Sequence, residues 1–216
     1  MILYDPETRE EWLQCRFKGL GGSDAGTVLG VNPYKTNVEL YEEKAGIRKN
    51  EFQGNAATQY GKDAEQHIRG IFLLDHPEYS CEYHEYRMYA DENYPYLYAT
   101  LDGELTETAT GRKGILEIKT GTIHNSSKWS EWTGRIPDVY YAQVLHQLFA
   151  TGWDFVDLRA YLKYETSEGT KATVRDYHIE RLEVLSDIQT LVLHEIKFWD
   201  AVQSRKEPAL IMPRID

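Results

Sequence analysis

Cysteine and long hydrophobic runs are what this chain most plainly lacks. Its cysteines, Cys15 and Cys81, form neither a C-x-x-C pair nor a His-rich spacing, which argues against zinc, an iron–sulfur cluster or a disulfide framework. No run of about eighteen apolar residues is present to span a membrane. The amino terminus has neither the basic stretch nor the apolar core of a signal peptide. We therefore expect a soluble protein of the reducing cytoplasm.

Basic charge is also scarce. The chain has 24 lysines and arginines against 35 aspartates and glutamates, for a formal net charge of −11. Proteins that coat nucleic acid without sequence preference usually carry a basic face, so the charge counts against that class. It leaves open an acidic cleft neutralised by metal, because two divalent cations would add about +4 and the local potential governs binding.

Length and patterning predict one α/β domain spanning residues 1–216. A chain of this size buries about 70% of its unfolded surface without disulfides, and neither a repeat nor a linker-like run divides it. The alternation of helical and strand patterns predicts a central mixed β-sheet flanked by helices. The expected helices are 6–17, 23–29, 38–45, 56–73, 138–150 and 185–202, and the expected strands are 82–89, 96–101, 103–106, 114–119, 157–164 and 172–179.

Several helix ends carry recognisable signals. Pro6 suits the first position of the first helix, which Gly21-Gly22 would end. Ser23 is the expected N-cap of the next helix. Thr36 and Glu39 have the spacing of a capping box for the third.

Two carboxylates and a lysine lie on strands that we expect to be neighbours. In the apolar run 114–120, the strand period of two places Glu117 and Lys119 on one face. A hairpin through residues 111–114 would bring Asp102 beside Glu117. Two close carboxylates repel unless a cation joins them. The pattern therefore predicts the divalent-metal chemistry of a phosphodiesterase.

The alternative for Glu117 and Lys119 is an ordinary surface ion pair. The Glu-x-Lys pattern recurs at Glu42-Glu43-Lys44 and at Glu195-Ile196-Lys197, in segments that we expect to be helical and solvent-facing. The upstream aspartate and the apolar strand favour catalysis over this alternative.

Two further polar residues are candidates for the same site. Glu65 projects from a largely apolar stripe of the expected helix 56–73, either toward a metal or into an intrahelical salt bridge with Lys62 or Arg69. Gln143 lies among apolar neighbours in a helix. It would either cap backbone groups or orient the lysine or an attacking water.

Arg16 and Ser23 bracket the turn 17–22. A guanidinium and a hydroxyl at a helix start form a ready phosphate site. The alternative is an ordinary N-cap beside a surface arginine.

Taken together, these segments resemble the viral-recombinase exonucleases of the lambda exonuclease/YqaJ type, a branch of the PD-(D/E)xK nuclease superfamily. The resemblance covers most of the chain, with six motifs in the family order. They are Trp12-x3-Arg16-x6-Ser23, Asn32-Pro33-Tyr34-Lys35-Thr36, Gly61-Lys62-x2-Glu65, Leu101-Asp102-Gly103, Leu116-Glu117-Ile118-Lys119 and Tyr141-Ala142-Gln143-Val144. The resemblance implies a restriction-endonuclease-like core.

The resemblance also implies roles at the catalytic positions. The family's counterparts of Asp102 and Glu117, with the carbonyl at Ile118, bind Mg²⁺. The glutamate matching Glu65 contributes to the metal site, and the lysine matching Lys119 assists the attacking water. Mg²⁺ is thus the expected cofactor, replaceable by Mn²⁺, with two ions per site.

Other positions carry over in the same way. The glutamine matching Gln143 supports the lysine, and the positions matching Arg16, Ser23 and Thr100 form the pocket for the 5′-phosphate of a DNA end. Leu101 replaces the family's usual proline, which only fixes backbone. The arginine that some members place beyond the lysine is missing before Lys128, so the resemblance implies catalysis but not strict 5′-phosphate dependence.

The expected function is Mg²⁺-dependent 5′-to-3′ degradation of double-stranded DNA ends, releasing 5′-mononucleotides and leaving 3′ overhangs for recombination by single-strand annealing. A structure-specific or nicking endonuclease is one alternative, and a non-catalytic DNA-end binding module is another. The resemblance further implies a trimer, a single-strand annealing partner and the cytoplasm of a bacterial host.

Overall fold

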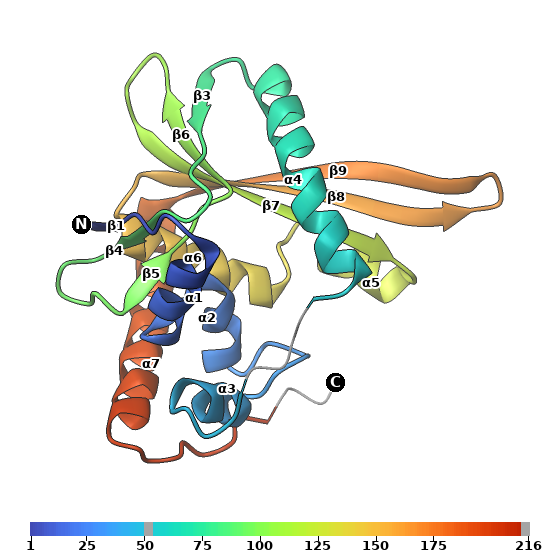
Figure 1. Ribbon diagram of the computed structural model, residues 1–216. Helices are drawn as coiled ribbons and strands as arrows, with labels where there is room; N and C mark the ends of the chain where they lie inside the picture. The colour runs from blue at the N-terminus through green and yellow to red at the C-terminus, as the bar shows by residue number, and fades with distance from the viewer. Residues whose placement is uncertain (50–53, 213–216) are drawn as a thin grey trace.

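The chain folds into two mixed β-sheets with helices packed against them (Figure 1). A computed structural model describes residues 1–49 and 54–212. The four-stranded sheet has the order β1 (Ile2–Tyr4), β4 (Met88–Ala90), β5 (Leu97–Ala99) and β2 (Leu20–Gly21). The five-stranded sheet has the order β3 (Tyr79–Glu82), β6 (Gly103–Glu107), β7 (Lys113–Ile123), β8 (Phe155–Thr166) and β9 (Gly169–Glu180).

The helices divide between the two faces of the larger sheet, with α4 on one face and α6 on the other (Figure 1). They are α1 (Arg9–Phe17), α2 (Gly22–Val28), α3 (Asn37–Lys44), α4 (Ala56–Asp75), α5 (Ser126–Glu131), α6 (Asp138–Thr151) and α7 (Leu185–Gln203), with a short 3₁₀ helix over Arg181–Val184. Within the described ranges, no helix is long and apolar enough to cross a membrane. The predicted mixed α/β architecture with flanking helices is confirmed.

Strand β7 separates two hydrophobic cores. Leu116 and Ile118 pack with Phe72 of α4 in one core, whereas Ile115 belongs to the larger core that includes α6 and α7. Alternate strand residues face opposite sides. Glu117 therefore emerges on the α6 face, among the side chains of the larger core.

Strand pairing places the carboxylates side by side. Strands β6 and β7 are antiparallel, with Gly103 opposite Leu116, so Asp102 lies beside the middle of β7. Strand β7 then runs parallel to β8, and the connection between them contains α5 and α6. This crossover lays α6 over the residues of β7 that carry charge.

The second, four-stranded sheet was not predicted, and the predicted strand 82–89 was wrong. That segment is two short strands, β3 and β4, which belong to different sheets. The loop 83–87 joins them. Tyr83 and Glu85 are exposed, whereas Met88 is fully buried. The chain therefore leaves the five-stranded sheet through a polar loop and enters the four-stranded sheet where its side chains become apolar.

Two predicted helix starts were also wrong. Helix α1 begins at Arg9 rather than Pro6, because Thr8 accepts a hydrogen bond from the Glu11 amide at 3.2 Å and acts as the N-cap. Helix α2 begins at Gly22 with Gly21 at the cap position, so Ser23 lies inside its first turn. The capping box of Thr36 and Glu39 is confirmed.

The two other Glu-x-Lys segments are helical, as expected, but they do not simply face solvent. Lys44, at the end of α3, has a side chain only 9% exposed and pairs with Asp24. Glu195 of α7 is fully buried and contacts His146 of α6 at 2.7 Å. Sequence alone therefore misjudged the exposure of both segments.

Candidate active site

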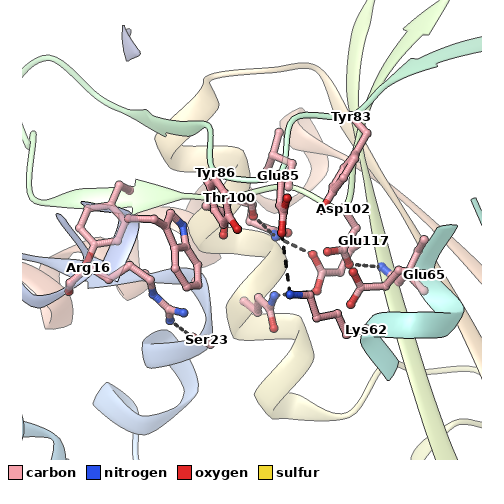
Figure 2. A pocket seen from close by; sticks show the side chains of 18 of the residues that line it. Arg16, Ser23, Lys62, Glu65, Tyr83, Glu85, Tyr86, Thr100, Asp102 and Glu117 are labelled. Carbon is pink, nitrogen blue, oxygen red and sulfur yellow. Dashed lines mark hydrogen bonds and ion pairs between the residues drawn. The ribbon is translucent and has the colours of Figure 1, made fainter. Parts of the chain in front are cut away.

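The site residues predicted from sequence gather in one cleft of about 580 Å³ (Figure 2). Its walls come from α1, the start of α2, α4, the loop 83–87, the turn after β5, β7 and α6. The predicted residues that line it are Arg16, Ser23, Glu65, Thr100, Asp102, Glu117, Ile118, Lys119 and Gln143. The structure thus brings together residues that are up to 127 positions apart, from 16 to 143.

Asp102 is held by two hydrogen bonds, one from β7 and one from α4. Its Oδ2 accepts from the Ile118 amide at 2.7 Å, and its carbonyl oxygen accepts from Arg69 Nε at 2.7 Å. The guanidinium of Arg69 also lies 3.8 Å from the ring centre of Tyr83. Strand β7 and helix α4 together therefore set the orientation of this carboxylate.

Glu117 is the most enclosed carboxylate of the cleft, at 2% exposure. Its Oε1 lies 2.6 Å from Lys119 Nζ and accepts from Gln143 Nε2 at 2.6 Å. Glu117 and Lys119 do form an ion pair, but a buried one, which rules out the surface-pair alternative. Gln143 contacts the partner of Lys119 rather than Lys119 itself.

Gln147 completes the surroundings of Glu117, and sequence reasoning missed it. Its Nε2 donates to Glu117 Oε2 at 2.6 Å, and the residue is 1% exposed. The signal was available: Gln147 is four positions after Gln143, so both amides share one face of α6. Two amides on one helical face among apolar neighbours indicate a common polar partner.

Glu65 projects from α4 toward Asp102 and Glu117 (Figure 2). In the described structure no ion pair joins it to Lys62 or Arg69, the partners of the salt-bridge alternative. Lys62 lies 3.8 Å from Glu85, and Arg69 donates to the Asp102 carbonyl. Glu65 therefore faces the carboxylates of Asp102 and Glu117.

Asp102, Glu117 and Glu65 lie in an electrostatically unfavourable arrangement at the acidic end of the cleft. Burial, and then the charges of Glu117 and Glu65, raise the pKa of Asp102 well above its ordinary value. Burial, and then Glu117, also raise the pKa of Glu65. A bound divalent cation would relieve this repulsion between the carboxylates. The oxygen-rich donor set of Asp102, Glu117 and Glu65 fits Mg²⁺ or Mn²⁺.

Lys119 is the positive charge within this acidic group. Burial would lower its pKa, but the charges of Glu117 and Asp102 outweigh burial and raise it. Its Nζ also lies 5.0 Å from the ring centre of Tyr140. The lysine is therefore held protonated beside the carboxylates.

The other end of the cleft is built around Arg16. Its Nη2 donates to Ser23 Oγ at 2.8 Å, and its guanidinium lies 4.7 Å from the ring centre of Trp12. Thr100 lines the cleft between this arginine and Asp102 (Figure 2). Ser23 is not the N-cap that the sequence suggested; its hydroxyl instead holds the arginine.

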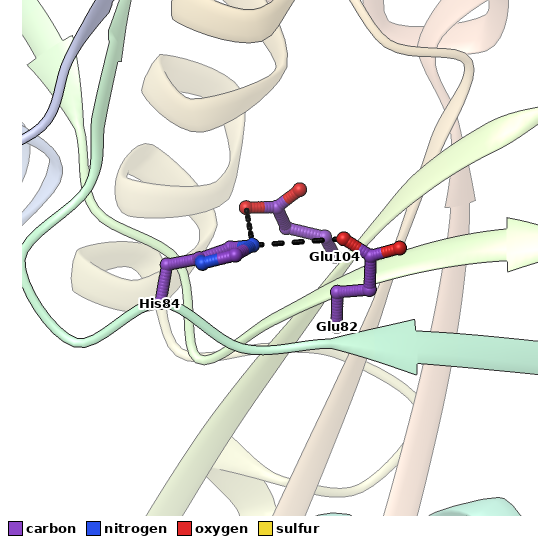
Figure 3. Close-up of side chains that lie close together, drawn as sticks. All are labelled: Glu82, His84 and Glu104. Atoms are coloured by element: carbon purple, nitrogen blue, oxygen red, sulfur yellow. Dashed lines mark ion pairs between the residues drawn. The ribbon is translucent and has the colours of Figure 1, made fainter.

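A second cluster of titratable side chains lies outside the cleft (Figure 3). Among the described residues, Glu82, His84 and Glu104 are the one set of three whose ligand atoms all lie within 4.8 Å of one another. His84 Nε2 is 3.6 Å from Glu82 and 3.8 Å from Glu104. Glu104 also lies 3.7 Å from Arg87 and accepts from Tyr89 at 2.5 Å. An arginine and a tyrosine hydroxyl thus already contact Glu104 of this cluster.

Solved structures define the class of fold. The chain matches an alkaline exonuclease (LHK-Exo) from Laribacter hongkongensis with a TM-score of 0.63 and 21% identity, over 91% of this chain and 96% of that one. It matches a phage-related exonuclease from Haemophilus somnus 129PT with a TM-score of 0.52 and 13% identity, over 87% and 96% of the two chains. The fold is thus that of the alkaline exonucleases.

Sequence comparison defines the family. Residues 11–154 match the YqaJ-like viral recombinase domain, and the chain belongs to that family. It is also 32% identical to the protein YqaJ of Bacillus subtilis (strain 168). The alignment covers 94% of this chain and 59% of YqaJ.

Proposed function

We propose that this protein is a metal-dependent deoxyribonuclease that degrades double-stranded DNA from its 5′ ends. This proposal rests on the two ends of one cleft. One end holds the Glu117–Lys119 pair beside Asp102, and the other holds Arg16 with Ser23. The first group suits hydrolysis of a phosphodiester, and the second suits a terminal phosphate. The family and the fold support the same class of enzyme.

The acidic end would hold the metal. Asp102 and Glu117 would be its ligands, with the carbonyl of Ile118 and the carboxylate of Glu65 completing the set. A divalent ion there, Mg²⁺ with Mn²⁺ as a substitute, would lower the pKa of a water and stabilise charge on the departing oxygen; we infer two ions per site. Gln143 and Gln147 hold the Glu117 carboxylate through hydrogen bonds of 2.6 Å.

Lys119 would orient the attacking water. Because Glu117 and Asp102 raise its pKa, the lysine stays cationic at neutral pH. In that form it donates hydrogen bonds and stabilises the negative charge that grows on the phosphate during attack. Its task is therefore to position a nucleophile and stabilise charge, rather than to remove a proton.

Arg16, Ser23 and Thr100 would bind the 5′-phosphate of the DNA end, which sets the polarity of degradation. Arginine donates in a fork that matches a phosphate. The expected products are 5′-mononucleotides and 3′ overhangs. LHK-Exo, which shares the fold, has been crystallised with dAMP, a nucleotide of that kind.

We also infer the biological setting from this activity. A 3′ overhang is the substrate of a single-strand annealing protein, which makes such a protein the expected partner. A trimeric assembly and the cytoplasm of a bacterial host complete the proposal. The chain spans 59% of the length of YqaJ. The assembly, the partner and the cellular location are therefore proposals.

The deciding experiment is the degradation of a linear duplex labelled at either the 5′ or the 3′ end, with Mg²⁺ or EDTA, beside a closed circular duplex. We expect Mg²⁺-dependent release of the 5′ label as a mononucleotide and an intact circle. Nicked circles would instead indicate an endonuclease. Bound DNA that retains both labels would indicate an end-binding module.

A further inference from the structure

A buried ion pair lies beneath Arg16. Lys44 of α3 and Asp24 of α2 approach within 2.9 Å, and their side chains are 9% and 13% exposed. Neither residue lines the cleft. Removing two charges from water is costly, and a buried pair adds little net stability. The position of this pair therefore calls for another explanation.

Both members of the pair also bond to the backbone of the segment that carries Arg16. Lys44 Nζ donates to the Arg16 carbonyl oxygen at 2.9 Å. Asp24 Oδ2 accepts from the Gly21 amide at 3.1 Å. The pair thus ties α2 and α3 to both ends of residues 16–21, the stretch between the arginine and the start of α2.

The same segment has little room to move. The Tyr98 hydroxyl donates a second hydrogen bond to the Arg16 carbonyl oxygen. A Cβ atom on Gly21 would lie 3.6 Å from Arg16 Nη2, so the guanidinium lies over the side of Gly21 on which a side chain would stand. The position of this segment therefore sets the space that the guanidinium occupies.

Charge supports the same conclusion. Burial would raise the pKa of Asp24, but Lys44, Arg16 and the Gly21 amide outweigh it and lower the pKa. The carboxylate is therefore ionised beside two cations. The three groups together keep one net positive charge for an anionic ligand.

We propose that Asp24 and Lys44 are positioning residues that fix Arg16 for recognition of a terminal 5′-phosphate. This inference rests on the phosphate pocket proposed above. The pair acts only through Arg16 and Gly21. Its loss should therefore lower the preference for phosphorylated ends without altering the metal end of the cleft.

The test compares kcat/KM on duplexes with 5′-phosphate and 5′-hydroxyl ends for Asp24→Asn, Lys44→Met and the double variant, with Tm measured for each. The matched control is Asp176→Asn, which removes a carboxylate from its 2.7 Å pair with the buried Arg159, outside the cleft. We expect the phosphate preference to fall about tenfold in all three pair variants, the effect of one lost hydrogen bond to a charged group. The control should keep the preference.

The double variant separates positioning from stability. Each single variant leaves a buried charge without its partner, so its Tm should fall; the double variant leaves none, so its Tm should recover. Its phosphate preference should stay low. The positioning role would be overturned if the double variant recovered both Tm and phosphate preference, or if the pair variants kept the wild-type phosphate preference. An equal loss of phosphate preference in Asp176→Asn would overturn it as well.

Arg16→Ala distinguishes this inference from the proposed function. If the wild-type protein shows no phosphate preference, or Arg16→Ala keeps it, the phosphate pocket itself is wrong and the inference falls with it. If Arg16→Ala loses the preference while the pair variants keep it, only the positioning role is refuted.

Discussion

Two clusters of carboxylates lie within this protein, and they differ in how their charge is balanced. The outer cluster consists of Glu82, His84 and Glu104. His84 and Arg87 lie within 3.8 Å of Glu104, and the Tyr89 hydroxyl donates a hydrogen bond to it. At the acidic end of the cleft, Lys119 lies beside Asp102, Glu117 and Glu65, and the pKa values of Asp102 and Glu65 are raised. The outer set is the tighter one.

Close spacing of ligand atoms is therefore a poor guide to the metal site here. In the outer cluster, Arg87 offsets the charge of Glu104, and the Glu82 side chain is 75% exposed to water, so a cation gains little there. At the acidic end of the cleft, burial and mutual repulsion keep the pKa values of Asp102 and Glu65 raised despite Lys119. Burial and repulsion between carboxylates, rather than spacing, favour the cleft as the place where a divalent ion binds.

The sharpest test removes one carboxylate from each cluster. Asp102→Asn should abolish the high-affinity Mg²⁺ site measured by calorimetry and lower nuclease activity by about 10³-fold or more, since metal catalysis supplies several kcal/mol. Glu104→Gln is the matched control and should leave both unchanged. Loss of the Mg²⁺ site in Glu104→Gln, with Asp102→Asn unaffected, would transfer the metal to the outer cluster.

Lys119→Ala probes the lysine that pairs with Glu117 in the cleft. The variant should bind Mg²⁺ and DNA yet turn over about 10²–10³-fold more slowly, the usual cost of removing a charge-stabilising donor. Calorimetry and single-turnover kinetics would separate the two effects. Loss of metal binding in this variant would mean that the lysine mainly holds Glu117 in place.

How much of the fold and the site the sequence predicts depends on how far apart along the chain the interacting residues lie. The strand period and the hairpin correctly placed Glu117 beside Asp102, because both signals are local. Gln147 was missed because a glutamine within a helix is common, and its partner lies 30 positions away. Local signals located the strands of the site, but not every side chain that meets there.

Contacts between distant segments explain the other misses. The smaller sheet was not predicted because its strands have only two or three residues, too few to establish a period. The Lys44–Asp24 pair was hidden because Lys44 belongs to a helix with a charged pattern typical of a solvent-facing surface. Tertiary packing, which places α3 against α2, decides its burial.

The pH dependence of stability should distinguish the two clusters without assaying activity. Asp102 and Glu65 have raised pKa values, so the folded protein binds protons more tightly than the unfolded chain does. The stability they contribute is present below their ordinary pKa values, and it is lost as pH rises through the raised ones. Urea unfolding without metal should show this decline.

Added Mg²⁺ should reverse the decline by binding the folded state. Asp102→Asn should flatten the dependence of stability on pH, because it removes one of the two carboxyl groups whose pKa is raised. Glu104→Gln should leave that dependence unchanged. A metal-free protein whose stability rises steadily over the same range would contradict the electrostatic strain that we assign to the cleft.

Glu65→Gln is expected to have the smallest effect of these changes. Glu65 reaches the cleft from α4, whereas Asp102 and Glu117 come from the sheet, so two of the three carboxylates would remain in place. We expect Mg²⁺ affinity to fall about tenfold, within the range for residues that support a metal site, with activity restored at higher Mg²⁺. Because the substitution keeps the shape of the side chain, folding should be unaffected. An unchanged Mg²⁺ titration would show that two carboxylates suffice, and that Glu65 only adds to the negative charge of the cleft.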